Sequence, residues 1–164
     1  MPLIRRTLVL VSLLAATAIV LAACGGGGGG GSSAAKANYA DALNRFCTSF
    51  KGGVAKVQAA TSRIPRHATR QQALGTFASA IDDYAKAIRQ GLKQLDDATP
   101  PSDYRSFNDG TVKGFTAAAG RLQQDAAKAR DGNVQVLSSI GQELNGIAVP
   151  DTPKDLATAA SACS

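Results

Sequence analysis

The sequence predicts an all-α fold: an up-down-up-down four-helix bundle, followed by a short C-terminal helix that a disulfide ties to the first helix. Three observations predict it. Apolar residues recur at three- and four-residue steps in four successive segments, which is the period of an amphipathic helix. No segment shows the convincing alternation of apolar and polar residues that marks a strand. Alanine is abundant and aromatic residues make up only 5% of the chain, which suits compact helices joined by short connections.

The first helix is predicted from about Lys36 to Ile64, before Pro65 blocks its continuation. Gly52-Gly53 is expected to weaken its middle by roughly 1 kcal/mol per glycine relative to alanine. Its apolar face consists of Tyr39, Leu43, Phe46, Phe50, Val54 and Val57.

The second helix, from about Gln71 to Leu95, has the clearest amphipathic pattern. Asp96-Asp97 and Pro100-Pro101 end it. Its apolar face consists of Leu74, Phe77, Ile81, Tyr84, Ile88 and Leu95, with Leu92 close to the seam.

The third helix is predicted to begin near Ser102, a good N-cap, and to end before a turn at Asp131-Gly132-Asn133. Asn108-Asp109-Gly110 could interrupt it, so its continuity is open. Its apolar side consists of Tyr104, Phe107, Phe115, Leu122 and intervening alanines.

The fourth helix is predicted from about Val134 to Ile147, with Leu137, Ile140, Leu144 and Ile147 facing inward. Thr152-Pro153 is typical of a helix start, with a cap followed by proline at the first helical position. The short helix that follows would carry Leu156, Ala159, Ala160 and Cys163.

Residues 1–23 have the three parts of a secretory signal. Arg5 and Arg6 give a positive start, an apolar stretch runs from Thr7 to Leu21, and the small residues Ala22 and Ala23 follow. An apolar stretch of about 15 residues is short for a stable transmembrane span of roughly 20. The sequence therefore predicts export rather than a membrane-spanning helix.

Leu21-Ala22-Ala23-Cys24 resembles the lipobox of bacterial lipoproteins. The resemblance implies that the Cys24 thiol receives a diacylglyceryl group and that a dedicated peptidase cuts before it. Two acyl chains anchor a protein stably. The expected location is the cell membrane, lipid-anchored on its extracytoplasmic face. The alternative is an ordinary signal peptide with an incidental cysteine.

Gly25 to Gly31, with Ser32 and Ser33, are expected to form a flexible tether. A phosphate-binding loop is excluded because no lysine follows the last glycine. The predicted organisation is a signal peptide at 1–23, the lipidated cysteine and Gly/Ser tether at 24–35, and a helical domain at 36–164.

Cys47 and Cys163 remain once Cys24 is assigned to the lipid. Extracytoplasmic compartments usually permit disulfides, and two thiols allow only one intramolecular pairing. The bond would close a loop of about 116 residues, which the chain-entropy model values at roughly 4–5 kcal/mol. A redox pair usually has CxxC spacing and a zinc site needs more ligands, so a structural disulfide is favoured.

The residues that catalysis needs are scarce. His67 is the only histidine and Glu143 the only glutamate, and neither has a sequence neighbour that would activate it. A di-iron bundle needs several glutamates and two histidines. Without Arg5 and Arg6 of the leader, 16 of the 18 basic residues remain against 12 acidic ones, a mild excess of +4. We therefore expect no enzyme, cofactor, metal or nucleic-acid partner.

Arg63, Arg66, His67 and Arg70 form a modest basic cluster in the connection between the first two helices. In a bundle this connection lies at the end opposite the tether. One hypothesis is electrostatic contact with an anionic cell-wall polymer or an envelope protein. The alternative is a solvated polar turn.

Two functions follow from this. The first is a non-enzymatic, membrane-anchored interaction or structural module of the envelope. The second is a carrier that holds a small apolar ligand between its helices, which the abundance of small residues permits. A continuous apolar pocket would favour the carrier, and a closed core with an exposed patch would favour the interaction module.

The chain also resembles a group of small helical lipoproteins and secreted proteins of actinobacteria. The features that carry the resemblance are Asn38-Tyr39, Asn44 and Cys47, Pro100-Pro101, Ala127 with Asp131-Gly132, and a cysteine at the extreme end. The resemblance implies a helical fold and export, and it implies no activity.

Overall fold

The computed structural model describes residues 30–147 and 151–163, and every element in these ranges is helical. The fold class is therefore confirmed as all-α. The predicted leader, Cys24 and the tether up to residue 29 lie outside the described residues. The helices are α1 (Gly30–Ser62), α2 (Arg70–Asp97), η1 (Ser102–Tyr104), α3 (Arg105–Arg130), α4 (Val136–Asn145), α5 (Lys154–Ala159) and η2 (Ser161–Cys163).

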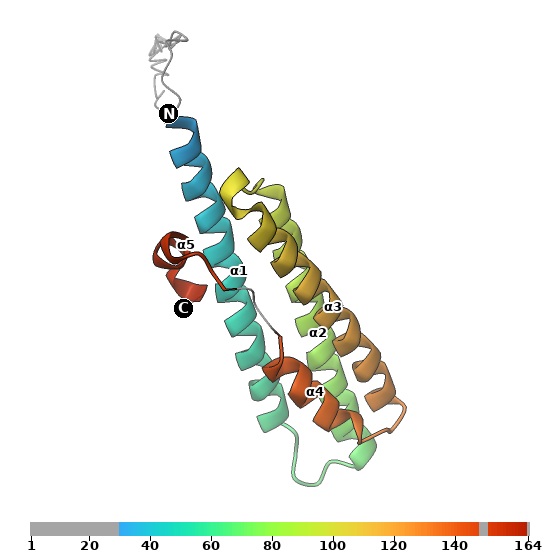
Figure 1. Ribbon diagram of the computed structural model, residues 1–164. Helices are drawn as coiled ribbons and strands as arrows, with labels where there is room; N and C mark the ends of the chain where they lie inside the picture. The colour runs from blue at the N-terminus through green and yellow to red at the C-terminus, as the bar shows by residue number, and fades with distance from the viewer. Residues whose placement is uncertain (1–29, 148–150, 164) are drawn as a thin grey trace, which may run out of the picture.

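Three long helices form the body of the molecule. Along the chain, α1, α2 and α3 run in alternating directions, and α2 packs against both of the others (Figure 1). The short helix α4 packs on α3 and makes no backbone approach to α1, whereas α5 and η2 pack on α1. Because α4 makes no backbone approach to α1 and so does not close the bundle as a fourth helix between α3 and α1, the predicted up-down-up-down four-helix bundle is not confirmed.

Helix α1 begins at Gly30, six residues before the predicted start at Lys36. Ala34, Ala35 and Ala37 are strong helix formers, and extending a helix that already exists costs far less than nucleating one. With 33 residues at a rise of about 1.5 Å per residue, α1 is about 50 Å long. The connection to α2 therefore lies far from the N-terminal end of α1 (Figure 1).

The start of α2 is set by a capping box. The Thr69 hydroxyl accepts from the Gln72 backbone N–H at 3.2 Å, and the Gln72 side chain accepts from the Thr69 N–H at 2.9 Å. Two backbone donors that a helix start leaves unpaired are thereby satisfied. At the other end, Thr99 has a positive φ of 49°, and Pro100 follows it. Both predicted bounds of this helix agree with the structure to within two residues.

Helix α3 runs without a break through Asn108-Asp109-Gly110, which settles its open continuity. Asn108 is 2% exposed, and its side-chain oxygen accepts from the Tyr39 hydroxyl of α1 at 3.0 Å. The polar residue therefore serves a contact between helices and does not interrupt α3. The predicted turn after α3 is present: Gly132 has φ +90°, and the Asn133 N–H donates to Lys128 at 3.1 Å.

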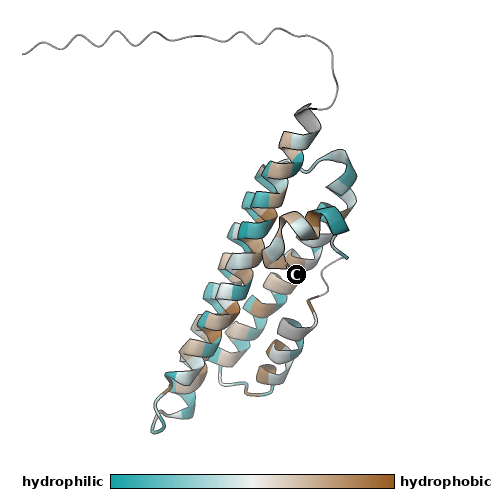
Figure 2. Ribbon diagram, turned by 90° about the vertical axis from the view of Figure 1, so that its left-hand side faces the viewer, coloured by the Kyte–Doolittle hydropathy of each residue, from teal (hydrophilic) through white to brown (hydrophobic). Residues whose placement is uncertain are grey.

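The core lies where the apolar faces of the three long helices meet. Hydrophobic and hydrophilic residues alternate along α1, which lies in front in Figure 2. The rings of Phe46 and Phe115 meet edge to face at a centroid distance of 4.9 Å. A Cβ on Gly91 would lie 2.9 Å from Phe46, and one on Gly53 would overlap the ring of Tyr84. Glycine thus allows α1 and α2 to approach closely at these two positions.

The fourth predicted helix is shorter than expected. Helix α4 ends at Asn145, and the Gly146 N–H closes it on the Gln142 carbonyl at 2.7 Å. Leu137 is predicted to face inward, but its side chain is 39% exposed. The periodicity correctly gives α4 an apolar face, and Val136 and Ile140 are buried. Because α1 does not cover the other edge of that face, Leu137 stays partly in solvent.

Candidate functional site

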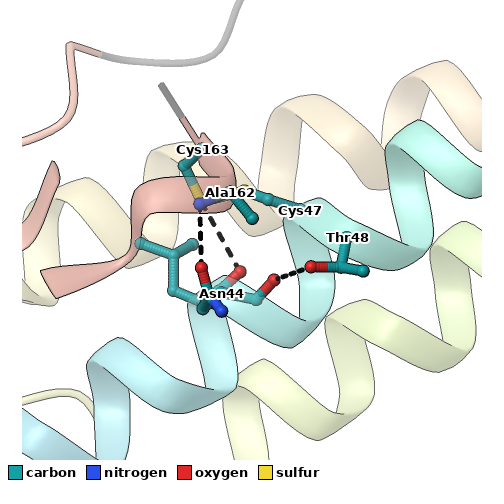
Figure 3. The surroundings of a disulfide bond; sticks show 6 residues. Asn44, Cys47, Thr48, Ala162 and Cys163 are labelled. Carbon is teal, nitrogen blue, oxygen red and sulfur yellow. Dashed lines mark hydrogen bonds between the residues drawn. A yellow bond between two sulfur atoms is a disulfide. The ribbon is translucent and has the colours of Figure 1, made fainter.

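The predicted disulfide between Cys47 and Cys163 is formed, with a Cα–Cα distance of 5.2 Å and a sequence separation of 116 residues. Asn44 lies one turn before Cys47, and its side-chain oxygen accepts from the Ala162 N–H at 2.8 Å (Figure 3). Cys163 Sγ also lies 3.5 Å from the Leu43 carbonyl, which is a contact and no hydrogen bond because a disulfide sulfur carries no proton. These contacts fix residues 151–163, which we call the C-terminal arm, to α1.

A polar cluster holds the start of α5 beside η1, near the N-terminal end of α1. The Tyr104 hydroxyl donates to Asp155 at 2.5 Å, and Lys36 pairs with Asp103 at 2.8 Å. The hydrogen bond from Tyr104 holds the pKa of Asp155 below its usual value, and the bond from Lys36 does the same for Asp103. Each of these groups has a partner, so the cluster ties elements together.

The two candidate residues for catalysis, His67 and Glu143, lie on different segments of the chain. Glu143 pairs with Arg121 at 2.7 Å and so links α4 to α3. His67 is exposed in the connection between α1 and α2. Within the ranges that the structure describes, no group of three or more His, Cys, Asp or Glu side chains could hold a metal ion.

The basic connection, residues Arg63 to Arg70, joins α1 to α2 at the end of the molecule opposite the start of α1 (Figure 1). Arg63, Arg66, His67 and Arg70 are all exposed. No ion pair between residues of the described ranges includes any of them. Three of the four residues thus lie in the loop between the helices and Arg70 is the first residue of α2, and none of the four has a direct carboxylate partner among the described residues.

An apolar cleft lies beside the basic connection, between the last turns of α1, the first turns of α2 and the exposed side of α4. Its volume is about 440 Å³, within the range of roughly 300–1,000 Å³ typical of small-molecule sites. The residues that line it are Val57, Gln58, Thr61, Ile64, Ala73, Leu74, Phe77, Leu137, Ile140 and Gly141. We refer to this space as the apolar cleft.

The apolar cleft exists because α4 leans on α3 and leaves a gap toward α1. The sequence did not predict it, because periodicity shows which face of a helix is apolar and does not show what covers that face. In the structure, the exposure of Leu137 marks the cleft, because Leu137 is the one large hydrophobic residue that is exposed among the described residues.

A larger groove of about 800 Å³ runs between α1 and α2, on residues such as Ser49, Gly52, Thr76, Ser79 and Gln94. Residues with hydroxyl or amide side chains and glycines make up most of its lining. It lacks the apolar lining typical of small-molecule sites. The apolar cleft is therefore the better candidate site, although it is the smaller of the two.

No protein-family model matches this chain, and neither a curated protein nor a solved structure gives a significant match. Within residues 30–147 and 151–163, none of the helices has the length and apolar character needed to cross a bilayer.

Proposed function

We propose that this chain is a membrane-anchored lipoprotein of the cell envelope that acts as a carrier for a small apolar ligand. The anchor is a lipid on Cys24, on the extracytoplasmic face of the membrane. The leader pattern and the residues before Cys24 support export and lipidation. The disulfide between Cys47 and Cys163 supports an oxidising compartment outside the cytoplasm.

The apolar cleft is the observation that carries the binding part of the proposal. Its rim includes the exposed Leu137, and its lining consists almost entirely of aliphatic and aromatic groups. When a ligand covers exposed apolar surface in a concave site, the removal of that surface from water favours binding by about 25 cal/mol per Å². A cleft of this kind favours a carrier over a purely structural module.

An interaction module remains a second candidate, and the unpaired arginines of the basic connection support it. Its partner would be an anionic cell-wall polymer or an envelope protein. Retention of the protein on anionic envelope polymers at low salt, lost at high salt, is expected for that function. Retention that is unchanged after Arg63, Arg66 and Arg70 are replaced by serine would contradict it.

Metabolic labelling with an alkyne fatty acid tests the anchor. The wild-type chain is expected to incorporate label, and Cys24→Ser is expected to lose it. Cys163→Ser is the matched control, because it also removes a cysteine and should keep the label. Label that persists in Cys24→Ser would contradict lipidation at this position.

Site-directed photolabelling tests the carrier function. A long-chain alcohol that bears a photoactivatable group is added to the full chain in lipid nanodiscs, and the labelled peptides are identified by mass spectrometry. Labelling is expected at α4 around Leu137 and at the first turns of α2. Labelling spread evenly over the surface, or none at these helices, would contradict a carrier.

A further inference from the structure

We propose that the ligand of the apolar cleft is a long-chain fatty acid. Its acyl chain lies against the cleft lining and its carboxylate lies at the basic connection. This inference rests on the proposed carrier function and adds the chemical class of the ligand.

The lining offers a ligand almost no hydrogen bonds. The Thr61 hydroxyl donates to the Val57 carbonyl of its own helix at 2.5 Å and is therefore already used. Gln58 carries the only other polar side chain among the lining residues. Burial of a ligand's polar group without a hydrogen-bond partner costs free energy and opposes binding. The polar end of the ligand must consequently lie at the mouth of the cleft.

Two arginines of the basic connection lie next to residues that line the cleft. Arg63 directly precedes Ile64, which lines the cleft. Arg70 precedes Ala73 and Leu74 by three and four residues, so all three lie on one face of α2. A guanidinium group matches a carboxylate in geometry and charge and can bind it through two parallel hydrogen bonds.

No carboxylate of the described residues forms an ion pair with the arginines at this end. Asp82 is paired with Arg130 at 2.9 Å, and Asp125 is paired with Lys128 at 2.9 Å. Asp131 is the remaining acidic residue at the end of α3, and it is exposed. The charges of the basic connection therefore favour an anionic headgroup over a neutral or a cationic one.

Other occupants fit less well. A two-fold contact between copies of the chain through this cleft presents the same patch from both partners, so it would bring the two basic connections toward each other. The resulting repulsion between like charges opposes such a dimer. The cleft volume of about 440 Å³ is also that of a small-molecule site, and a typical protein interface is much more extensive.

Two pairs of variants separate the acyl chain from the headgroup. Gly141 lines the cleft, and nothing lies within 4 Å of a Cβ built on it, so the Cβ of Gly141→Leu is unobstructed and its side chain is expected to fill part of the cleft. Gly120→Leu is the control, because Gly120 is equally unobstructed and lines no cavity found in the described residues.

The headgroup variant replaces Arg63, Arg66 and Arg70 together by glutamine. Its control replaces Arg45, Arg89 and Arg105, three exposed arginines elsewhere on α1, α2 and α3, so that both variants lose the same charge. All four variants change surface or cleft-facing positions and leave the core intact.

The experiment compares two photoactivatable probes of equal chain length, palmitic acid and the neutral alcohol, on the full chain in lipid nanodiscs. Palmitic acid is expected to label the peptides of the cleft about tenfold more than the alcohol. Gly141→Leu should abolish this labelling, and the triple Arg63/Arg66/Arg70 variant should reduce labelling by palmitic acid to the level of the alcohol. The two controls should behave as the wild type does.

Each other result overturns a defined part of the account. Equal labelling of the cleft by both probes would contradict the anionic headgroup and leave the carrier function standing. So would full labelling by palmitic acid in the triple variant. If neither probe labels the cleft, the carrier function itself fails. A dimer in sedimentation velocity that Gly141→Leu dissociates would identify the cleft as a contact between copies instead.

Discussion

Tyr39 of α1 donates its hydroxyl to the side-chain oxygen of Asn108 of α3 at 3.0 Å, in a place where Tyr39 is 0% and Asn108 2% exposed. Tyr84 of α2 is buried as well, but its hydroxyl has no hydrogen-bond partner among the described residues. The two phenols are thus a matched pair. The Tyr39 hydroxyl donates to a buried amide, whereas the Tyr84 hydroxyl forms no hydrogen bond with the described residues.

Tyr39→Phe is expected to lower the free energy of unfolding by roughly 1–3 kcal/mol, because it leaves the Asn108 amide oxygen buried without a donor. Tyr84→Phe removes a buried hydroxyl that has no partner, so the free energy of unfolding should stay the same or rise. Urea unfolding followed by circular dichroism measures both. An equal loss in the two variants would contradict the assigned hydrogen bond.

The neighbouring glycines Gly52 and Gly53 should respond to alanine in opposite directions. Nothing lies near a Cβ on Gly52, so Gly52→Ala is expected to stabilise the protein by about 0.5–1 kcal/mol through helix propensity. A Cβ on Gly53 would overlap the Tyr84 ring, so Gly53→Ala should destabilise it by about 1–3 kcal/mol. Thermal unfolding of the two variants checks this, and a gain in both would mean that α1 and α2 do not approach closely here.

The disulfide should contribute strongly to stability because it joins residues 116 apart in the sequence. Replacing Cys47 and Cys163 together by serine is expected to lower the free energy of unfolding by roughly 4–5 kcal/mol, mainly by freeing the unfolded chain. The wild type in a reducing buffer should show the same loss in urea unfolding. A loss below about 1 kcal/mol would show that the C-terminal arm contributes little.

The buried phenols predict a loss of stability at alkaline pH. Burial raises the pKa of Tyr39 and of Tyr84 well above the ordinary value of about 10. Above that ordinary value the unfolded chain loses phenol protons while the folded chain keeps them. Ionisation then favours the unfolded state, so the free energy of unfolding should fall increasingly from about pH 10 upward.

Urea midpoints measured at pH 8, 10 and 11 test this. The pKa of Tyr104 is also raised, by its hydrogen bond to Asp155, so Tyr84→Phe removes one of three such phenols and should make the alkaline decrease shallower than in the wild type. A decrease of the same steepness in both proteins would assign the effect to groups other than Tyr84.

The sequence predicts the long helices well because local signals mark their ends. Pro65 and Pro100 block helix continuation because the proline ring clashes with the preceding turn and lacks an N–H donor, and Gly132 supplies the positive φ that ends α3. The disulfide is predicted because, with Cys24 assigned to the lipid, only one pairing remains. These features need no knowledge of how the helices pack.

The position of α4 and the apolar cleft depend on packing between segments that are distant in the sequence. The periodicity of α4 predicts Leu137 inward, but its exposure depends on whether α4 leans on α1 or on α3. In the same way, the sequence predicts only that Gly53 weakens its helix. The structure shows that the Tyr84 ring packs against Gly53. The sequence indicates the basic connection of the candidate site, whereas the cleft beside it becomes visible only in the structure.

We propose that a lipid on Cys24 holds the domain to the outside of a membrane, while the basic connection and the apolar cleft lie at the end of the helical domain opposite the start of α1. The intact mass of the native protein, extracted from membranes of its host, tests this most directly. The expected mass is that of a chain that begins at Cys24 and carries a diacylglyceryl group, with or without a further acyl chain. An unmodified chain that still begins at Met1 would contradict it.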